Sequence, residues 1–322
     1  MTSLAGHPGY GQTVAKIILF GEHSVVYGHP AVAMPLQSLK MTAEVEPSDG
    51  PGTLAGLGWS GPLDKAPARF SSIIRAAEVA SAFAGHAGAH LHITTDAGFP
   101  AERGLGSSAA AAGAVIRAVL DAFDAPATPD EIFTLTQQAE RVAHGRPSGL
   151  DAVATSADGP VHFRGGVVTE LDVSPDAWIV IADSGIQGST RETVGHVRAR
   201  YEADPDSVGA VLARLGDITD EVIALLHERD TPAIGRRATE AHRLLASLGV
   251  SNDRLDILVN AALSAGALGA KLTGGGRGGC VIAFADSEES AHRIEHAFVT
   301  AGAAGTWVHA PEPGSLAGEV AR

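Results

Sequence analysis

Cysteine and long apolar runs are scarce in this chain, and each shortage excludes a class of protein. The only cysteine, Cys280, rules out a disulfide within the chain and argues against a metal site built on thiolates. No apolar run reaches the ~18 residues of a membrane-spanning helix. The N-terminal residues show neither the basic stretch nor the apolar segment of a secretory signal, so we expect a cytoplasmic protein.

Positive charge is also scarce. The chain has 23 Lys and Arg against 37 Asp and Glu, a net charge of −14. This balance argues against nucleic acid and acidic membranes as partners. The lysines are Lys16, Lys40, Lys65 and Lys271. An acidic protein that handles phosphates must place its few cations locally, and Lys16 and Lys271 lie in the most motif-like segments.

The bulk composition is that of an ordinary folded protein, with 45% hydrophobic and 19% charged residues. A length of 322 residues favours two domains over one. We expect the domains to span residues 1–175 and 176–322.

Hydrophobic periodicity and turn residues predict the order of the elements. The Thr128-Pro129-Asp130-Glu131 sequence is typical of a helix start, and that helix should continue to about Ala143. Residues 47–69 are rich in Gly and Pro and indicate an exposed excursion. The expected strands are 14–20, 31–36, 42–46, 89–95, 161–171, 178–182, 270–273 and 281–284, and the expected helical regions are 70–84, 191–248 and 254–268.

A glycine–serine loop precedes a long Ala-rich helix: Gly104-Leu105-Gly106-Ser107-Ser108-Ala109. Either serine can cap that helix, the glycines allow a close approach to a ligand, and a helix start binds phosphate. An ordinary capped helix explains the segment as well. A dinucleotide fingerprint is disfavoured because the nearest strand-like run ends at Thr95, and the lysine of a Walker A loop is absent.

Charged residues near turns supply candidates for chemistry. Glu140 closes a helix and Asp151 follows a tight turn, so one could hold a metal while the other orients or deprotonates a hydroxyl. Both could equally be solvated surface acids. Lys16 interrupts an apolar strand, and a buried lysine needs a charged partner. The alternative is an edge-strand lysine.

A glycine-dense loop follows Lys271. It contains Gly274, Gly275, Gly276, Gly278 and Gly279, more glycines than a hairpin turn requires. This density favours close approach to another backbone or a ligand.

Four segments in this order resemble the GHMP kinase superfamily and, within it, the mevalonate kinase family. They are Lys16–Gly28, Gly104–Ala109, Glu140–Asp151 and Lys271–Cys280. Each alone is a moderate signal, and all four in order are highly specific. The resemblance implies an α+β, two-domain GHMP kinase fold with the active site in the cleft between the domains.

The activity that the resemblance implies is phosphorylation of the primary hydroxyl of mevalonate by ATP with Mg²⁺. The loop Gly104–Ala109 would wrap the triphosphate, and Ser108 and Glu140 match the magnesium ligands. Asp151 matches the acid that receives the hydroxyl proton or orients the hydroxyl. Lys16 matches the lysine that holds this acid ionised and stabilises charge during transfer.

The resemblance also implies a substrate end of the site. Glu22 and His23 match it, and Thr190 or Arg191 would meet a substrate carboxylate. The glycine loop would abut the phosphate-binding loop and steady it. Whether two chains form a homodimer is left open.

Rival functions differ from this one by specific residues. The first rival is another small-molecule kinase of the superfamily. Phosphomevalonate kinases, for example, differ in that they tend to have a tyrosine where His23 stands. A non-catalytic ATP-binding sensor is the second, and it should have lost one of Lys16, Glu140 and Asp151, which are all present. A nicotinamide oxidoreductase is the third.

Overall fold

The computed structural model describes residues 6–144 and 148–311. The chain divides into two compact units, one of Met1–Lys16 with Pro35–Asp158 and one of Ile17–Met34 with Gly159–Arg322. The main change along the chain thus falls between Asp158 and Gly159, and the domain boundary near residue 175 stays a prediction.

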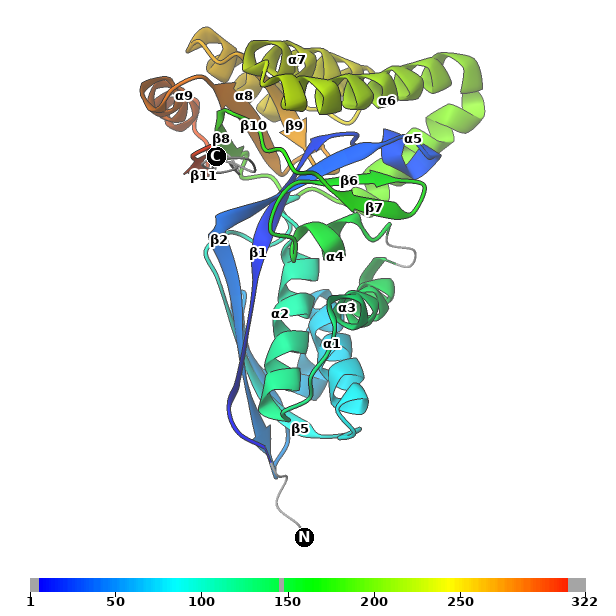
Figure 1. Ribbon diagram of the computed structural model, residues 1–322, viewed down its shortest axis with the longest axis vertical. Coiled ribbons are helices and arrows are strands. Elements are labelled where there is room, and N and C mark those ends of the chain that lie inside the picture. Colours follow the sequence, from blue (N-terminus) through cyan, green and yellow to red (C-terminus); the bar gives the residue numbers. More distant parts are fainter. Residues whose placement is uncertain (1–5, 145–147, 312–322) are drawn as a thin grey trace, which may run out of the picture. The chain divides into compact units, whose positions relative to one another are not determined.

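The first unit contains a twisted sheet (Figure 1). It comprises β3 (Thr53–Gly56), β4 (Trp59–Pro62), β5 (His90–Ala97) and the larger parts of β1 (Gly9–Phe20) and β2 (Ala31–Ser48). Residues 17–20 of β1 and 31–34 of β2 belong to the second unit. The strands follow the order β4-β3-β5-β2, with β1 paired to β2. Two sequence predictions need correction here. The runs 31–36 and 42–46 form the single strand β2, and residues 47–69 include the β3–β4 hairpin, whose backbone pairs with β5.

Helices α1 (Ser71–Phe83), α2 (Ser107–Ala122), α3 (Pro129–His144) and α4 (Leu150–Ala154) complete this unit. The first three pack on one another. Helix α2 is buried along almost its whole length, and its alanines keep the side chains small enough for neighbours on all sides. It therefore gives the loop before it a rigid support.

The starts of α2 and α3 differ. Thr128 and Glu131 cap α3 reciprocally, with Thr128 N donating to Glu131 Oε2 at 2.7 Å, so the predicted helix start is confirmed. The prediction that Ser107 or Ser108 caps α2 is wrong. The cap is Gly106 in a left-handed conformation, no side chain caps this end, and Ser107 Oγ accepts from Glu102 N instead.

The second unit contains the hairpin β6 (Val161–Arg164) and β7 (Val167–Glu170), which pairs with the start of β2. The single strand expected over 161–171 is thus a hairpin. A four-stranded sheet has the order β11-β8-β10-β9, with β8 (Trp178–Asp183), β9 (Gly269–Thr273), β10 (Cys280–Ala285) and β11 (Gly305–His309).

Helices α5 (Thr190–Ala203), α6 (Pro205–Glu228), α7 (Thr231–Ser247), α8 (Asp253–Ser264) and α9 (Glu288–Thr300) belong to the second unit. Helices α7, α8 and α9 pack against strands of the four-stranded sheet, on the same side in Figure 1. A short 3₁₀ turn, η1 (Ser24–Tyr27), follows β1 and contacts α6.

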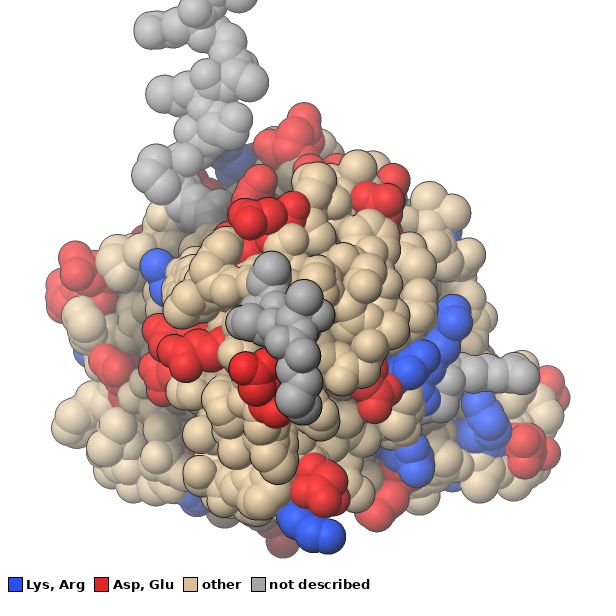
Figure 2. Space-filling model, turned by 90° about the horizontal axis from the view of Figure 1, so that it is seen from below, with Lys and Arg blue, Asp and Glu red and all other residues tan. Residues whose placement is uncertain are grey.

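Surface charge follows the acidic composition. Acidic side chains are spread over much of the face in Figure 2, and basic ones gather mainly toward its right side. Among the described residues, no helix combines the length and the apolar character that crossing a membrane requires.

Candidate active site

Lys16 and Asp151 form an ion pair in the first unit. Lys16 Nζ lies 2.9 Å from Asp151 Oδ1, and the Lys16 side chain is 3% exposed while that of Asp151 is 48% exposed. A buried ammonium group requires a partner because it has lost its hydration. The open carboxylate is therefore held by a cation that water does not reach, and it can still accept a proton or a hydrogen bond from a bound hydroxyl.

Gly106 brings the glycine–serine loop against Lys16. Lys16 N donates to Leu105 O at 3.0 Å. Gly106 has φ +73°, and a Cβ there would lie 2.8 Å from Lys16 Cγ and 3.1 Å from Thr155 Cγ2. Only glycine fits this backbone without strain and without displacing Lys16.

Ser108 and Glu140 form the second polar pair of this unit. Ser108 Oγ donates to Glu140 Oε1 at 2.7 Å, and Ser72 Oγ of α1 lies 3.2 Å from Ser108 Oγ. Glu140 is 3% exposed. The pair brings two hard oxygen atoms together at the N-terminus of α2, where the helix dipole favours an anion.

The placement of Asp151 depends on the turn before it. Gly149 has φ +95°, and a Cβ there would lie 2.5 Å from Gln137 Nε2 of α3. The close contact sets the start of α4, which carries Asp151, against α3, which carries Glu140. Gly145, Arg146 and Pro147, which belong to the matched catalytic segment, lie outside the described residues.

His23 follows β1 in the second unit with φ +61°, an unusual value for a residue other than glycine. Its Nε2 donates to Gly275 O at 2.8 Å. A carbonyl oxygen only accepts, so the proton of the neutral ring is on Nε2 and Nδ1 is an acceptor. Burial lowers the pKa of His23, although the bond to Gly275 opposes this effect. The ring is therefore a neutral group that can accept a hydrogen bond from a hydroxyl.

Glu22 is buried and pairs with Lys271 of β9, which is also buried. Glu22, which the resemblance implies is a substrate residue, thus forms an ion pair with Lys271 of the same unit. Lys271 lies in one of the predicted motifs, but no role was predicted for it. The sequence sign of such a role is a charged residue within an otherwise apolar strand.

The glycine loop packs against other backbone segments of its unit, as its glycine density predicts. A Cβ at Gly276 would lie 2.1 Å from Val250 O, and one at Gly278 would lie 2.6 Å from Ile186 O. A Cβ at Gly275 would lie 2.9 Å from Thr190 Oγ1. The loop thus brings together His23 and Thr190, two of the predicted substrate residues. Arg191 lies exposed in the first turn of α5.

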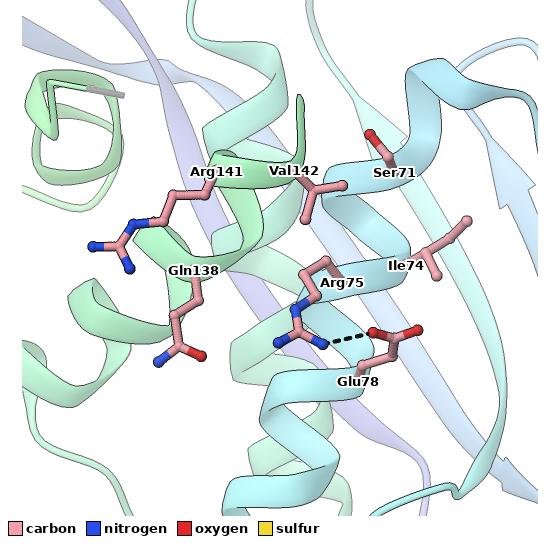
Figure 3. A pocket seen from close by; sticks show the side chains of 7 residues that line it. All are labelled: Ser71, Ile74, Arg75, Glu78, Gln138, Arg141 and Val142. Atoms are coloured by element: carbon pink, nitrogen blue, oxygen red, sulfur yellow. Dashed lines mark hydrogen bonds and ion pairs between the residues drawn. The ribbon is translucent and has the colours of Figure 1, made fainter. Parts of the chain in front are cut away.

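A hollow of about 640 Å³ is lined by residues of α1 and α3 (Figure 3). Arg75 pairs with Glu78 on its α1 side at 2.9 Å. The residues lining it are Ser71, Ile74, Arg75, Glu78, Gln138, Arg141 and Val142. Glu140 is two residues beyond Gln138, about 200° around the helix. The hollow therefore faces away from the Ser108–Glu140 pair.

Comparisons with known proteins identify the family to which the chain belongs. The family model of the GHMP kinases N terminal domain matches residues 71–159, and that of the GHMP kinases C terminal matches residues 222–304. The chain therefore belongs to the GHMP kinase family, enzymes that use ATP, and the expected α+β fold of two domains is confirmed.

Relatives in this family carry more specific names. The chain is 35% identical to the mevalonate kinase of Thermococcus onnurineus (strain NA1), over 86% of this chain and 89% of the relative. It is 35% identical to the mevalonate kinase of Pyrococcus abyssi (strain GE5 / Orsay), over 85% of this chain and 88% of the relative. The crystal structure of L. major mevalonate kinase in complex with R-mevalonate matches with a TM-score of 0.82 and 25% identity, covering 96% of this chain and 98% of that one.

Proposed function

We propose that this chain transfers the γ-phosphoryl group of ATP to the primary hydroxyl of mevalonate, giving 5-phosphomevalonate. The observation that carries the proposal is the Lys16–Asp151 pair, an accessible carboxylate on a buried cation, with Gly106 of the phosphate-binding loop packed on the Lys16 stem. Phosphoryl transfer requires positioning and charge neutralisation more than covalent chemistry. The names of the relatives support mevalonate as the acceptor.

Asp151 and Lys16 act on the hydroxyl that attacks. The free side of the Asp151 carboxylate accepts the hydroxyl hydrogen, which either orients the oxygen or takes up its proton. Lys16 holds the carboxylate in place through the ion pair and offsets the negative charge that gathers near the transferred group. Because Lys16 is buried, its charge acts at low dielectric and is screened little by solvent.

Gly104–Ala109 bind the triphosphate of ATP in this proposal. The uncapped start of α2 supports this role, because the backbone N–H groups of a first helical turn have no intrahelical partner. The helix dipole adds to the attraction.

Ser108 and Glu140 would hold Mg²⁺. No group of three or more His, Cys, Asp or Glu side chains suited to a metal occurs in the parts of the chain that the structure describes. A hydroxyl and one carboxylate fit magnesium, which is usually bound by one or two carboxylates, substrate phosphates and water. When bound, the ion neutralises phosphate charge.

The substrate end comprises His23, Thr190, Arg191 and Glu22 in this proposal. The neutral His23 accepts from a hydroxyl, and it suits the carboxylate of mevalonate poorly because both groups would be acceptors. Arg191 or Thr190 meets that carboxylate as a donor. Glu22 belongs to this end through the turn that it shares with His23.

ATP consumption with mevalonate, phosphomevalonate, galactose and homoserine, measured side by side, tests the proposal. We expect kcat/KM for mevalonate to exceed that for the other three by ~10²-fold or more, because a site built for a substrate's polar groups rejects mismatched ones by such factors. Equal or faster turnover of phosphomevalonate would contradict mevalonate as the substrate and leave the fold assignment intact.

A further inference from the structure

The ion pair between Glu22 and Lys271 is almost completely buried. The Lys271 side chain is 0% exposed and that of Glu22 is 1% exposed. Lys271 Nζ also donates to Leu272 O at 2.8 Å and lies 5.7 Å from the centre of the Phe20 ring. Burial lowers the pKa of Lys271, and the charge of Glu22 opposes that shift.

Stability alone does not account for such a pair. Removing two charges from water costs several kcal/mol per ion, and apolar residues of similar volume often stabilise a protein as well or better. In some proteins a buried pair instead fixes one arrangement of the segments that carry it. The segments here are the turn that follows β1, which carries Glu22, and the strand β9, which carries Lys271.

Two neutral contacts join the same parts of the chain, residues 18–23 and residues 271–275. Ile18 N donates to Thr273 Oγ1 at 3.0 Å, and Thr273 Oγ1 donates to Ile18 O at 3.0 Å. His23 Nε2 donates to Gly275 O at 2.8 Å. The ion pair is thus the charged one of three contacts that join these segments, and its Glu22 directly precedes His23.

His23 needs such support. Its left-handed φ of +61° is unfavourable for a residue with a Cβ and persists only where the surroundings enforce it. The residue directly before it, Glu22, is the one held by Lys271. The position of Glu22 therefore bears directly on the backbone that sets the His23 ring.

We propose that Lys271 is a positioning residue for mevalonate: through Glu22 it fixes the turn that presents His23 to a substrate hydroxyl. Lys271 touches no reacting atom in this role. The inference rests on the proposed function and deepens it, since it assigns His23 Nδ1 to the tertiary hydroxyl, the donor that mevalonate has besides the hydroxyl that reacts.

The test is the double variant E22Q/K271M, which removes both charges and leaves no buried ion unpaired. We expect its Tm to stay within a few degrees of wild type, its KM for mevalonate to rise about tenfold or more, and its KM for ATP to change less than about twofold. The matched control is R214M/E240Q, which removes one cation and one anion from the half-buried network of Arg214, Glu221, Arg237 and Glu240 on α6 and α7 and leaves the Arg237–Glu221 pair in place. This variant should leave both KM values unchanged.

A substrate analogue gives a readout that a purely structural role would not change. Wild type should use 5-hydroxy-3-methylpentanoate, which lacks the tertiary hydroxyl, ~10²-fold less efficiently than mevalonate. This preference should nearly vanish in His23→Ala and fall by at least about tenfold in E22Q/K271M, as expected for coupled groups.

Two results would overturn the inference. One is a folded double variant that keeps the wild-type KM for mevalonate and the wild-type preference over the analogue. The other is an equal rise of both KM values together with a large loss of Tm, which would make the pair merely structural. Failure of the proposed function is distinguishable, because wild type would then not phosphorylate mevalonate at all.

Discussion

Asp151 is the residue whose charge the proposed chemistry uses most directly. Asp151→Asn keeps the size of the side chain and removes the charge that faces the hydroxyl. Because a group used mainly in the transition state affects turnover, we expect kcat to fall by ~10²-fold or more while the affinities for ATP and mevalonate are nearly kept. Steady-state kinetics and equilibrium binding measure the two effects separately.

Lys16→Met, alone and combined with Asp151→Asn, tests whether the two residues act as one unit. Since the two groups are in contact at 2.9 Å, the double variant should be little worse than the poorer single variant. Additive losses would mean that the residues act independently, and near-normal turnover of Asp151→Asn would remove Asp151 from the mechanism.

The lack of a side chain at Gly106 leaves room for the stem of Lys16. Gly106→Ala puts a Cβ 2.8 Å from Lys16 Cγ and strains a backbone at φ +73°. We expect kcat to fall by about tenfold or more because Lys16 must move away from Asp151. The control is Gly85→Ala, where φ is +83° and no atom lies within 4 Å. That variant carries the backbone strain alone and should lower stability without lowering kcat.

Glu140 provides the charged oxygen of the proposed magnesium site. Glu140→Gln should raise the Mg²⁺ concentration needed for half-maximal activity by about tenfold, because a hard cation prefers a carboxylate to an amide. A titration of activity with Mg²⁺ at fixed ATP measures this. Asp130→Asn, an exposed acid in the first turn of the same helix, is the control. Identical magnesium curves for Glu140→Gln and wild type would exclude Glu140 as a ligand.

At the scale of elements, the glycine loop and α5 hold each other in place. Gly275→Ala introduces a Cβ 2.9 Å from Thr190 Oγ1 and 3.1 Å from Thr193 Oγ1. Backbone on both sides must then shift, so we expect KM for mevalonate to rise about tenfold, since small misplacements of binding groups are costly.

The matched control for that change lies on α5 itself. A Cβ at Gly195 meets no atom within 4 Å, so Gly195→Ala adds only helix propensity and should stabilise the protein slightly. Steady-state kinetics and thermal unfolding of Gly275→Ala and Gly195→Ala test this prediction. An unchanged KM in Gly275→Ala would show that the contact between loop and helix does not position substrate.

For the whole molecule, buried histidines set a dependence of stability on pH. Burial lowers the pKa of His23 and of His242 below the ordinary 6.5, more than hydrogen bonding raises it. Below pH 6.5 the unfolded chain therefore binds more protons than the folded one. The free energy of unfolding should fall with decreasing pH in this window, by up to about 1.4 kcal/mol per pH unit for each histidine.

Urea unfolding at pH 7.5 and at pH 5.5 measures this slope. His242 lies outside the proposed site, donates to Asp256 Oδ1 and accepts from Leu272 N. His242→Gln keeps a polar side chain that does not titrate, so its slope should be shallower than that of wild type. The same slope in both proteins would mean that His242 does not carry the effect.

Local patterns in the sequence determined much of this molecule. The reciprocal cap of Thr128 and Glu131, the position of α3 and the glycine loop between β9 and β10 all follow from neighbours a few residues apart, whose interactions depend on backbone propensity and periodicity. The same local reasoning failed at the start of α2, because Gly106, with a left-handed backbone packed against Lys16, takes the cap position, and Ser107 and Ser108 are already the first two helical residues.

Only the tertiary structure decided which charged residues meet. Glu22 and Lys271 are 249 positions apart, and no local pattern reports that one is the partner of the other. The same holds for Lys16, whose strand pattern fitted an exposed edge as well as a buried pair with Asp151. The physical reason is that a buried charge is tolerable only beside an opposite one, and which one is available depends on how the strands and helices pack.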